Sequence, residues 1–260
     1  MPPKRRGAVH FFLLAFASTW GLQIPGILAQ RGILPGNPSA YLPFAGLGLL
    51  GPLAAATLLA WREAGRAGVR SLYAPLARWR VHPGWWLTAL VPSLLLSGFL
   101  FLLNLAGRQG PIAYLPSAGM VVFGVLASIG EEVGWRGYAL PKLQERWSAF
   151  AAGSLIGVMW CVWHLPMFVG QGVPLSLLLM MLLYFVGASL FMTWSYNATG
   201  GSLLLASFVH FGAHLNNSHR ALPGETLPLV VHAVVFGALG LLVMRAQVRS
   251  PAHRVARLSS

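Results

Sequence analysis

The chain has 260 residues, of which 56% are hydrophobic and only 9% are charged. Soluble domains carry about 25% charged residues, so this composition excludes an ordinary soluble domain and indicates a polytopic membrane protein. Eighteen Lys and Arg stand against five acidic residues. Because the basic residues fall between apolar segments rather than along one polar face, they argue against a nucleic-acid partner and favour roles in topology and in contacts with membrane lipids.

Apolar runs of roughly membrane-spanning length follow one another along the whole chain. A helix needs about 20 apolar residues to cross the hydrocarbon. Eight runs come near this length, at about residues 8–29, 40–61, 86–105, 118–135, 150–169, 175–194, 202–215 and 227–244. The first could be a signal peptide, but its length favours a retained span. We therefore expect one all-α membrane domain over residues 1–260, with about eight transmembrane helices, the seventh being the shortest and most polar.

The distribution of positive charge predicts the orientation of these spans. With eight spans, fifteen of the eighteen Lys and Arg fall on the side that holds both termini. The positive-inside rule then places the N and C termini in the cytoplasm, in a multi-pass protein of the cell membrane. The basic stretch 62–83 is expected to lie on an anionic leaflet, and the mixed stretch 137–147 to form an interfacial turn or amphipathic helix.

Two adjacent carboxylates, Glu131 and Glu132, lie in the fourth apolar run. Ionisable groups at membrane depth cost about 2.5–3.5 kcal/mol each and tend to be functional. On a helix Glu132 and Arg136 share a face and can form an ion pair, whereas Glu131 points about 100° away. Glu131 therefore needs a partner from another helix. From this segment alone, the alternative is a membrane boundary where both glutamates are solvated or paired with Arg136.

Three histidines lie in other apolar runs, His164 in the fifth and His210 and His214 in the seventh. Each could be a neutral imidazole that hydrogen-bonds a neighbouring helix. The spacing of His210, His214 and Asn217 places all three on one helical stripe. Together with Glu131, the histidines allow two chemistries. Two imidazoles four residues apart can bind one metal ion, or Glu131 can act as a base while the imidazoles hold water and a developing oxyanion.

The order of these motifs resembles that of the CPBP family, the CAAX prenyl protease type II and bacteriocin-processing (Abi) intramembrane proteases. That family has Glu-Glu-x-x-x-Arg, then aromatic-x-x-x-His, then His-x-x-x-Asn on separate membrane helices. Here the three motifs read Glu131-Glu132-x-x-x-Arg136, Trp160-x-x-x-His164 and His210-x-x-x-His214, within about residues 118–218. His214 thus stands where the family usually has Asn.

The resemblance implies an intramembrane endopeptidase that hydrolyses a peptide bond of a membrane-associated substrate, with its site between helices four, five and seven. It implies that Glu131 activates water and that His164 and His210 complete the site. Glu132 and Arg136 belong to the same motif. Either His214 itself or Asn217, one turn further along the same stripe, would take over the role of the family's Asn.

The resemblance leaves a metal open, because the family is described as metalloproteases while a metal-independent glutamate mechanism has been argued for it. Zinc would use Glu131, His164, His210 and His214 as candidate ligands; otherwise no cofactor is expected. The alternative function is a proton-coupled transporter that uses Glu131 and the histidines as a relay, and a third is a non-catalytic scaffold. The sequence lacks the repeat symmetry often seen in transporters, and it leaves the substrate and the oligomeric state open.

Overall fold

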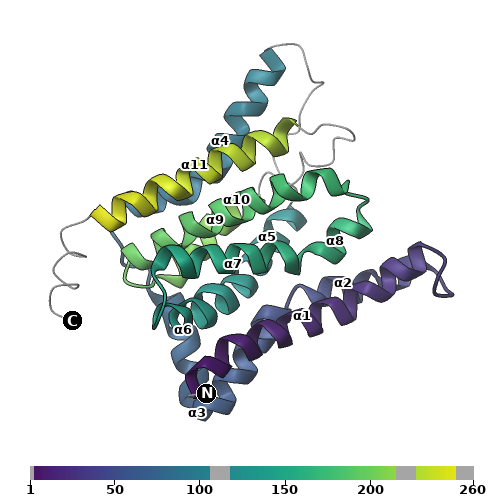
Figure 1. Ribbon diagram of the computed structural model, residues 1–260, viewed down its shortest axis with the longest axis horizontal. Coiled ribbons are helices and arrows are strands. Elements are labelled where there is room, and N and C mark those ends of the chain that lie inside the picture. The colour runs from purple at the N-terminus through teal and green to yellow at the C-terminus, as the bar shows by residue number, and fades with distance from the viewer. Residues whose placement is uncertain (1–2, 106–117, 215–226, 250–260) are drawn as a thin grey trace.

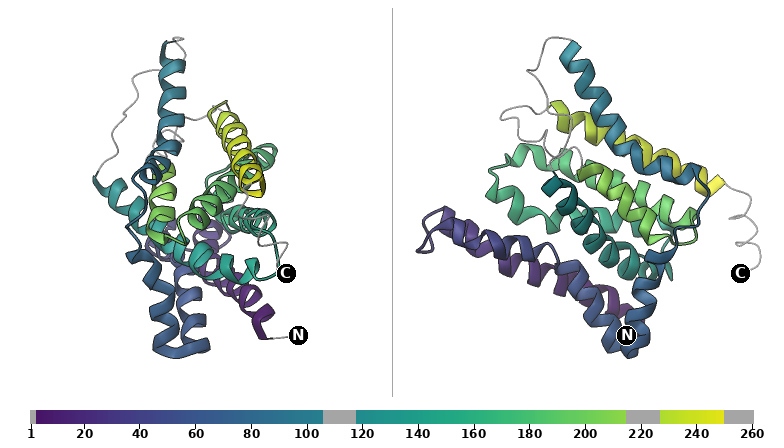
Figure 2. Two further views of the ribbon diagram at one scale, coloured as in Figure 1. Left: turned by 90° about the vertical axis from the view of Figure 1, so that its left-hand side faces the viewer. Right: turned by 180° about the vertical axis from the view of Figure 1, so that it is seen from behind.

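The computed structural model describes residues 3–105, 118–214 and 227–249. Within these ranges every regular element is helical, which confirms the predicted all-α, polytopic membrane fold (Figure 1). The long helices run side by side, and the start of α1 and the end of α11 lie toward the same side of the molecule (Figures 1 and 2). Asn217 and the predicted loop around Arg108 lie outside the described residues.

The N-terminal half, as far as the structure describes it, has three long α-helices, one short α-helix and two 3-10 turns. They are α1 (Pro3–Gln30), η1 (Pro38–Tyr41), α2 (Leu42–Gly48), α3 (Gly51–Tyr73), η2 (Ala74–Ala77) and α4 (Gly84–Leu105). Inside α3 the backbone leaves helical geometry at Ala64 and Gly65, where Gly65 has a φ of 57°. The basic stretch after Trp61 is therefore largely helical, with a kink.

The second half carries all three motifs on separate elements. It comprises α5 (Ala118–Glu132), η3 (Val133–Ala139), α6 (Leu140–Gln144), α7 (Ala149–Trp163), α8 (Leu165–Gly170), η4 (Leu175–Leu177), α9 (Leu178–Ala198), α10 (Leu203–His214) and α11 (Leu227–Arg249). In the part of the chain that the structure describes, each of the eight expected apolar runs falls on one helix or on adjoining helical elements. The stretch 137–147 continues the helix through α6 and ends in a turn.

Three helical stretches among the described residues are long and apolar enough to cross a membrane. These are Gly7–Gln30, Ala149–Gly170 and Leu175–Ala198. The pair Pro38–Gly48 and Gly51–Ala77, bent by 44° at its break, could be a fourth. The number of eight spans thus stays a prediction.

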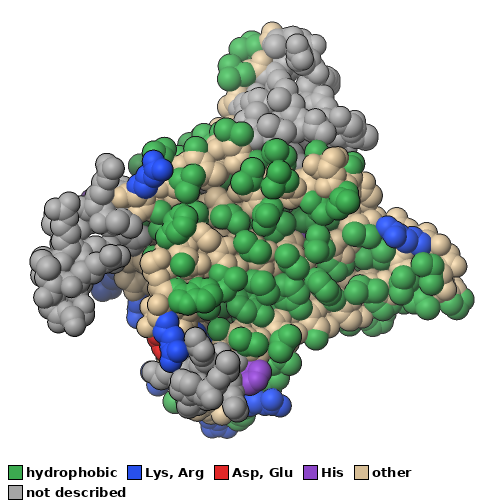
Figure 3. Space-filling view, in the orientation of Figure 1, with side chains coloured by type: hydrophobic (Ala, Val, Ile, Leu, Met, Phe, Trp, Pro, Cys, Tyr) green, Lys and Arg blue, Asp and Glu red, His purple; other side chains and the backbone are tan. Residues whose placement is uncertain are grey.

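Small residues bring the helices that carry the motifs into backbone contact. A Cβ atom added at Gly157 of α7 would lie 2.6 Å from the Cα of Val186 in α9, closer than real atoms approach. One added at Gly134 of η3 would lie equally close, 2.6 Å, to the Cβ of Pro52 at the start of α3. Close backbone approach of this kind is typical of helix packing in membranes. These close contacts hold η3 and α7, which both carry several buried residues, against neighbouring helices. The outer face shown in Figure 3 is largely hydrophobic, as expected for contact with lipid.

Candidate active site

The first motif spans a change in helix type. Regular α5 ends at Glu132, and the next seven residues, Val133–Ala139, form a π-helix in which the N–H of Leu140 bonds the carbonyl of Trp135, five residues earlier. Such π-helical turns are rare and frequently lie at functional sites. The two glutamates therefore sit where α5 passes into η3, in the interior of the helix bundle.

Glu131 is buried and faces α7. Glu131 is only 2% exposed, and its Oε2 accepts a hydrogen bond of 2.6 Å from Nε1 of Trp160. This contact confirms that Glu131 finds its partner on another helix. The donor is the indole of Trp160, which forms the aromatic position of the second motif, whereas the sequence analysis considered only the histidines of other helices beside Glu131.

Glu132 serves as a shared acceptor for two buried side chains. Its Oε1 accepts from Nη1 of Arg136 at 2.8 Å, which confirms the predicted ion pair. The same oxygen lies 2.9 Å from Nδ1 of His210 in α10. All three residues are at most 3% exposed. Glu132 thus connects the first motif to the third, a link that helical spacing within one segment could not reveal.

Arg136 has further partners beyond the ion pair. Its Nη2 donates to Oγ of Ser189 in α9 at 3.0 Å, and Ser189 in turn donates to the carbonyl of Gly153 in α7 at 2.7 Å. The guanidinium carbon also lies 5.6 Å from the centre of the Trp160 ring. Ser189 was not predicted as a site residue. The available signal in the sequence was a hydroxyl within the apolar run 175–194, a feature that Ser189 shares with Thr193.

Three of the predicted metal-ligand candidates come together. One ligand atom from each of Glu131, His210 and His214 lies within 4.8 Å of the other two. The rings of His210 and His214 are stacked, with centres 4.9 Å apart, as expected for residues four apart on α10. The donor set of one carboxylate and two imidazoles is the one found in thermolysin-type zinc sites.

His164 lies next to this group rather than in it. It occupies the junction of α7 and α8, where its Nδ1 lies 2.8 Å from the carbonyl oxygen of Trp160. Its ring packs edge-on to Trp163 at 4.6 Å and against Phe185 at 4.8 Å. Among the described residues, His164 is thus not one of the three whose ligand atoms lie within 4.8 Å of one another.

The hydrogen bonds of Glu132 set the chemistry open to His210. Since Arg136 donates to Oε1 of Glu132, that oxygen is an acceptor, and Nδ1 of His210 must be the donor in their contact. A neutral His210 then has a lone pair on its second nitrogen. It can accept a proton of a bound water or ligate a cation, but in this tautomer it cannot donate to an oxyanion. Of the roles that the sequence left open for His210, holding water and binding a metal ion remain, and donating to an oxyanion is excluded for this tautomer.

Comparisons with known proteins find similarity to CAAX prenyl proteases. The family model described as type II CAAX prenyl endopeptidase Rce1-like matches residues 113–216. CAAX prenyl protease 2 of Methanococcus maripaludis is 34% identical over 110 residues, which cover 39% of this chain and 41% of that protein. The match thus spans about two fifths of the relative's length. The segment matched by the family model includes all three motifs. Both comparisons agree with the resemblance of residues 113–216 to the CPBP family of intramembrane proteases.

Proposed function

We propose that this chain is an intramembrane endopeptidase in which Glu131 activates the water that hydrolyses a peptide bond. The observation that carries the proposal is the position of Glu131: a buried carboxylate fixed by Trp160, within 4.8 Å of the two imidazoles of α10, in the segment that matches a family of endopeptidases. A buried acid next to two imidazoles has the groups needed for general acid–base catalysis. No contact among the described residues favours the transporter alternative.

The proposed reaction uses the two oxygens of Glu131 differently. Trp160 holds Oε2, so Oε1 takes a proton from the attacking water while the water oxygen bonds to the carbonyl carbon of the substrate. The second nitrogen of His210 accepts the water's other hydrogen as a hydrogen bond and orients it. Glu131 then gives its proton to the departing amine nitrogen as the C–N bond breaks, which returns the carboxylate to its starting state.

Glu132 and Arg136 act on this reaction through His210. Glu132 fixes the orientation and tautomer of the imidazole through Nδ1, and Arg136 balances the charge of Glu132 inside the bundle. A buried ion pair with both partners hydrogen-bonded can stay charged, whereas either charge alone would be costly. We therefore assign Glu132 and Arg136 as positioning residues. His164 stays a proposed member of the site on the basis of the second motif. Asn217 stays one on the basis of its spacing from His210 and His214.

The residues present also fit a zinc ion. Glu131, His210 and His214 would hold it, and Glu132 would orient His210 as carboxylates commonly orient zinc-bound imidazoles. When bound there, zinc would act as a Lewis acid on the scissile carbonyl and would help to activate water. The roles assigned above to Trp160, Glu132 and Arg136 are the same with or without the ion.

The substrate proposed is a membrane-associated peptide or protein, with a prenylated CAAX tail as the first candidate because both comparisons bear that name. The test uses the purified chain in liposomes with a prenylated CAAX reporter peptide. A parallel proteomic comparison of membranes with wild-type protein and with Glu131→Gln searches for other substrates.

The expected result is cleavage by the wild type and a loss of about 100-fold or more in Glu131→Gln, the size usual for a general base. The variant keeps the shape of the side chain, so its melting temperature serves as the folding control. Wild-type cleavage by Glu131→Gln would overturn the assignment of the base. Absence of any cleaved peptide or altered membrane protein would overturn the endopeptidase function.

A further inference from the structure

A cavity lies apart from the site, between the start of α1, the α6 segment and α7. Its volume is about 350 Å³, which is within the range of small-ligand pockets. Its lining includes Phe12, Lys142, Arg146, Trp147, Leu155 and Met159. The residues grouped around Glu131 do not line it, and the inference below is independent of the proposed function.

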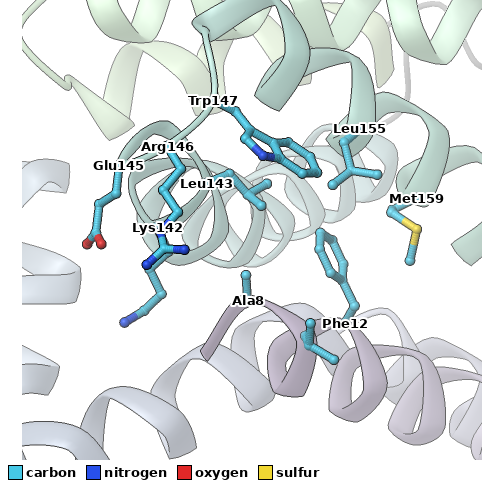
Figure 4. Close-up of a pocket in the computed structure, with 10 residues that line it drawn as sticks. Ala8, Phe12, Lys142, Leu143, Glu145, Arg146, Trp147, Leu155 and Met159 are labelled. Carbon is cyan, nitrogen blue, oxygen red and sulfur yellow. The ribbon is translucent and has the colours of Figure 1, made fainter. Parts of the chain in front are cut away.

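The cavity is divided into a basic end and an apolar end. Figure 4 shows Lys142 and Arg146 together on one side, and Phe12, Leu155 and Met159 on the other. Lys142 is fixed by an ion pair of 2.8 Å with Glu63 of α3. Arg146 is exposed to solvent. An amphipathic lining of this kind matches a ligand with an anionic head and an apolar tail.

The position of the cavity along the helices agrees with such a ligand. Trp147 is 48% exposed and lies two residues before α7 begins. Tryptophan is enriched at the level of lipid headgroups. Val9, which lines the cavity, and Phe150, in the first turn of α7, are apolar and 56% and 44% exposed. The basic end therefore lies at headgroup level, and the apolar end lies beside the acyl chains.

We propose that this cavity binds one anionic phospholipid, with its phosphate at Arg146 and Lys142 and one acyl chain along Phe12, Leu155 and Met159. A guanidinium binds phosphate through two parallel hydrogen bonds, which makes Arg146 the main anchor. Basic pockets between membrane helices are suited to anionic headgroups, and the chain as a whole has a net charge of +13. Glu145 lies at the same end and opposes an anion there.

The test is native mass spectrometry of the purified full chain with phosphatidylglycerol and phosphatidylcholine of identical acyl chains. We expect one phosphatidylglycerol to be retained in preference to phosphatidylcholine. Removing one basic group near a membrane surface is worth about 1 kcal/mol, so Arg146→Gln should weaken retention of phosphatidylglycerol about fivefold. Glu145→Gln, which removes the opposing charge, should strengthen it.

The matched control is Arg66→Gln, which removes an exposed arginine of α3 that does not line the cavity. It should leave retention unchanged, which separates a specific site from general attraction between a basic protein and acidic lipid. Equal retention of the two lipids, or equal losses in Arg146→Gln and Arg66→Gln, would overturn the proposal. So would displacement of the lipid by a prenylated peptide in the wild type, because that would make the cavity a substrate site.

Discussion

Glu131 and Trp160 are joined by a hydrogen bond of 2.6 Å between carboxylate and indole, across 29 residues of sequence. The bond links the first and second motifs and gives the aromatic position of the second motif a polar role. It also fixes one oxygen of the carboxylate, which leaves the other to exchange a proton. An aromatic residue without an N–H at this position would keep the packing but lose the bond.

Trp160→Phe tests that role directly. A hydrogen bond to a charged group is worth about 1.5–3 kcal/mol, so loss of the indole N–H should lower kcat/KM by about 10- to 100-fold if the bond is fully used in the reaction. Cleavage of the reporter peptide measures this. Trp86→Phe is the matched control, since Trp86 of α4 packs edge-on against Phe208 of α10. Equal activity of the two variants would show that the indole is only a packing residue.

Glu132→Gln should affect stability more than the chemistry that Glu131 performs. It leaves Arg136 and His210 with a neutral partner in the interior, and breaking a buried pair costs about 3–5 kcal/mol. We expect a large fall in the melting temperature in detergent. The double variant Glu132→Gln with Arg136→Met removes the unpaired cation and should recover part of this loss. A double variant less stable than the single one would argue against the buried-charge explanation.

The sequence predicted the elements of this site better than its connections. Glu132 and Arg136 could be paired from their spacing, because an α-helix brings residues four apart onto one face. The stacking of His210 on His214 follows from the same rule. The contacts between helices could not be predicted this way: periodicity says which face a residue is on, but not which helix lies opposite. Thus Trp160 on Glu131, His210 on Glu132 and the Ser189 link needed the three-dimensional structure.

For the fold too, the helices could be predicted from the sequence, but their local irregularities could not. Apolar length located the helices, since lipid requires internally hydrogen-bonded segments. Local departures from α-helical geometry were missed. The non-helical φ and ψ at Ala64 and Gly65, in the basic stretch, and the π-helix at Val133–Ala139 depend on local packing rather than on composition. Of these, only Gly65, with its φ of 57°, offered a sequence signal.

Thr19 of α1 lies outside the matched segment, yet it supports the junction that carries His164. Its hydroxyl accepts from Nε1 of Trp163 at 2.8 Å and donates to the carbonyl of Gly48 at 2.6 Å, in a residue that is 0% exposed. Thr19→Val keeps the shape and leaves both groups without this partner. We expect a loss of about 2 kcal/mol or more in stability and a reduced kcat.

Thr19→Ser is the matched control for that substitution, because it keeps the hydroxyl and removes only a methyl group. It should restore the melting temperature and kcat nearly to wild-type values. If Thr19→Ser were as impaired as Thr19→Val, packing of the methyl group rather than the two hydrogen bonds would be what holds the Trp163–His164 junction.

The last prediction concerns zinc, and it depends on the difference between His164 and the other two histidines. Ligand atoms of Glu131, His210 and His214 lie within 4.8 Å of one another, and His164 is not in this group. If zinc binds there, His210→Ala and His214→Ala should each lower the amount of bound zinc. His164→Ala should leave that amount unchanged. Elemental analysis of the purified variants measures this without reference to activity. Loss of cleavage after chelation, with recovery when zinc is added, would establish that the wild type uses the metal. Full activity in metal-free protein would instead leave Glu131 acting alone on water, with His210 orienting that water through the nitrogen that Glu132 does not hold.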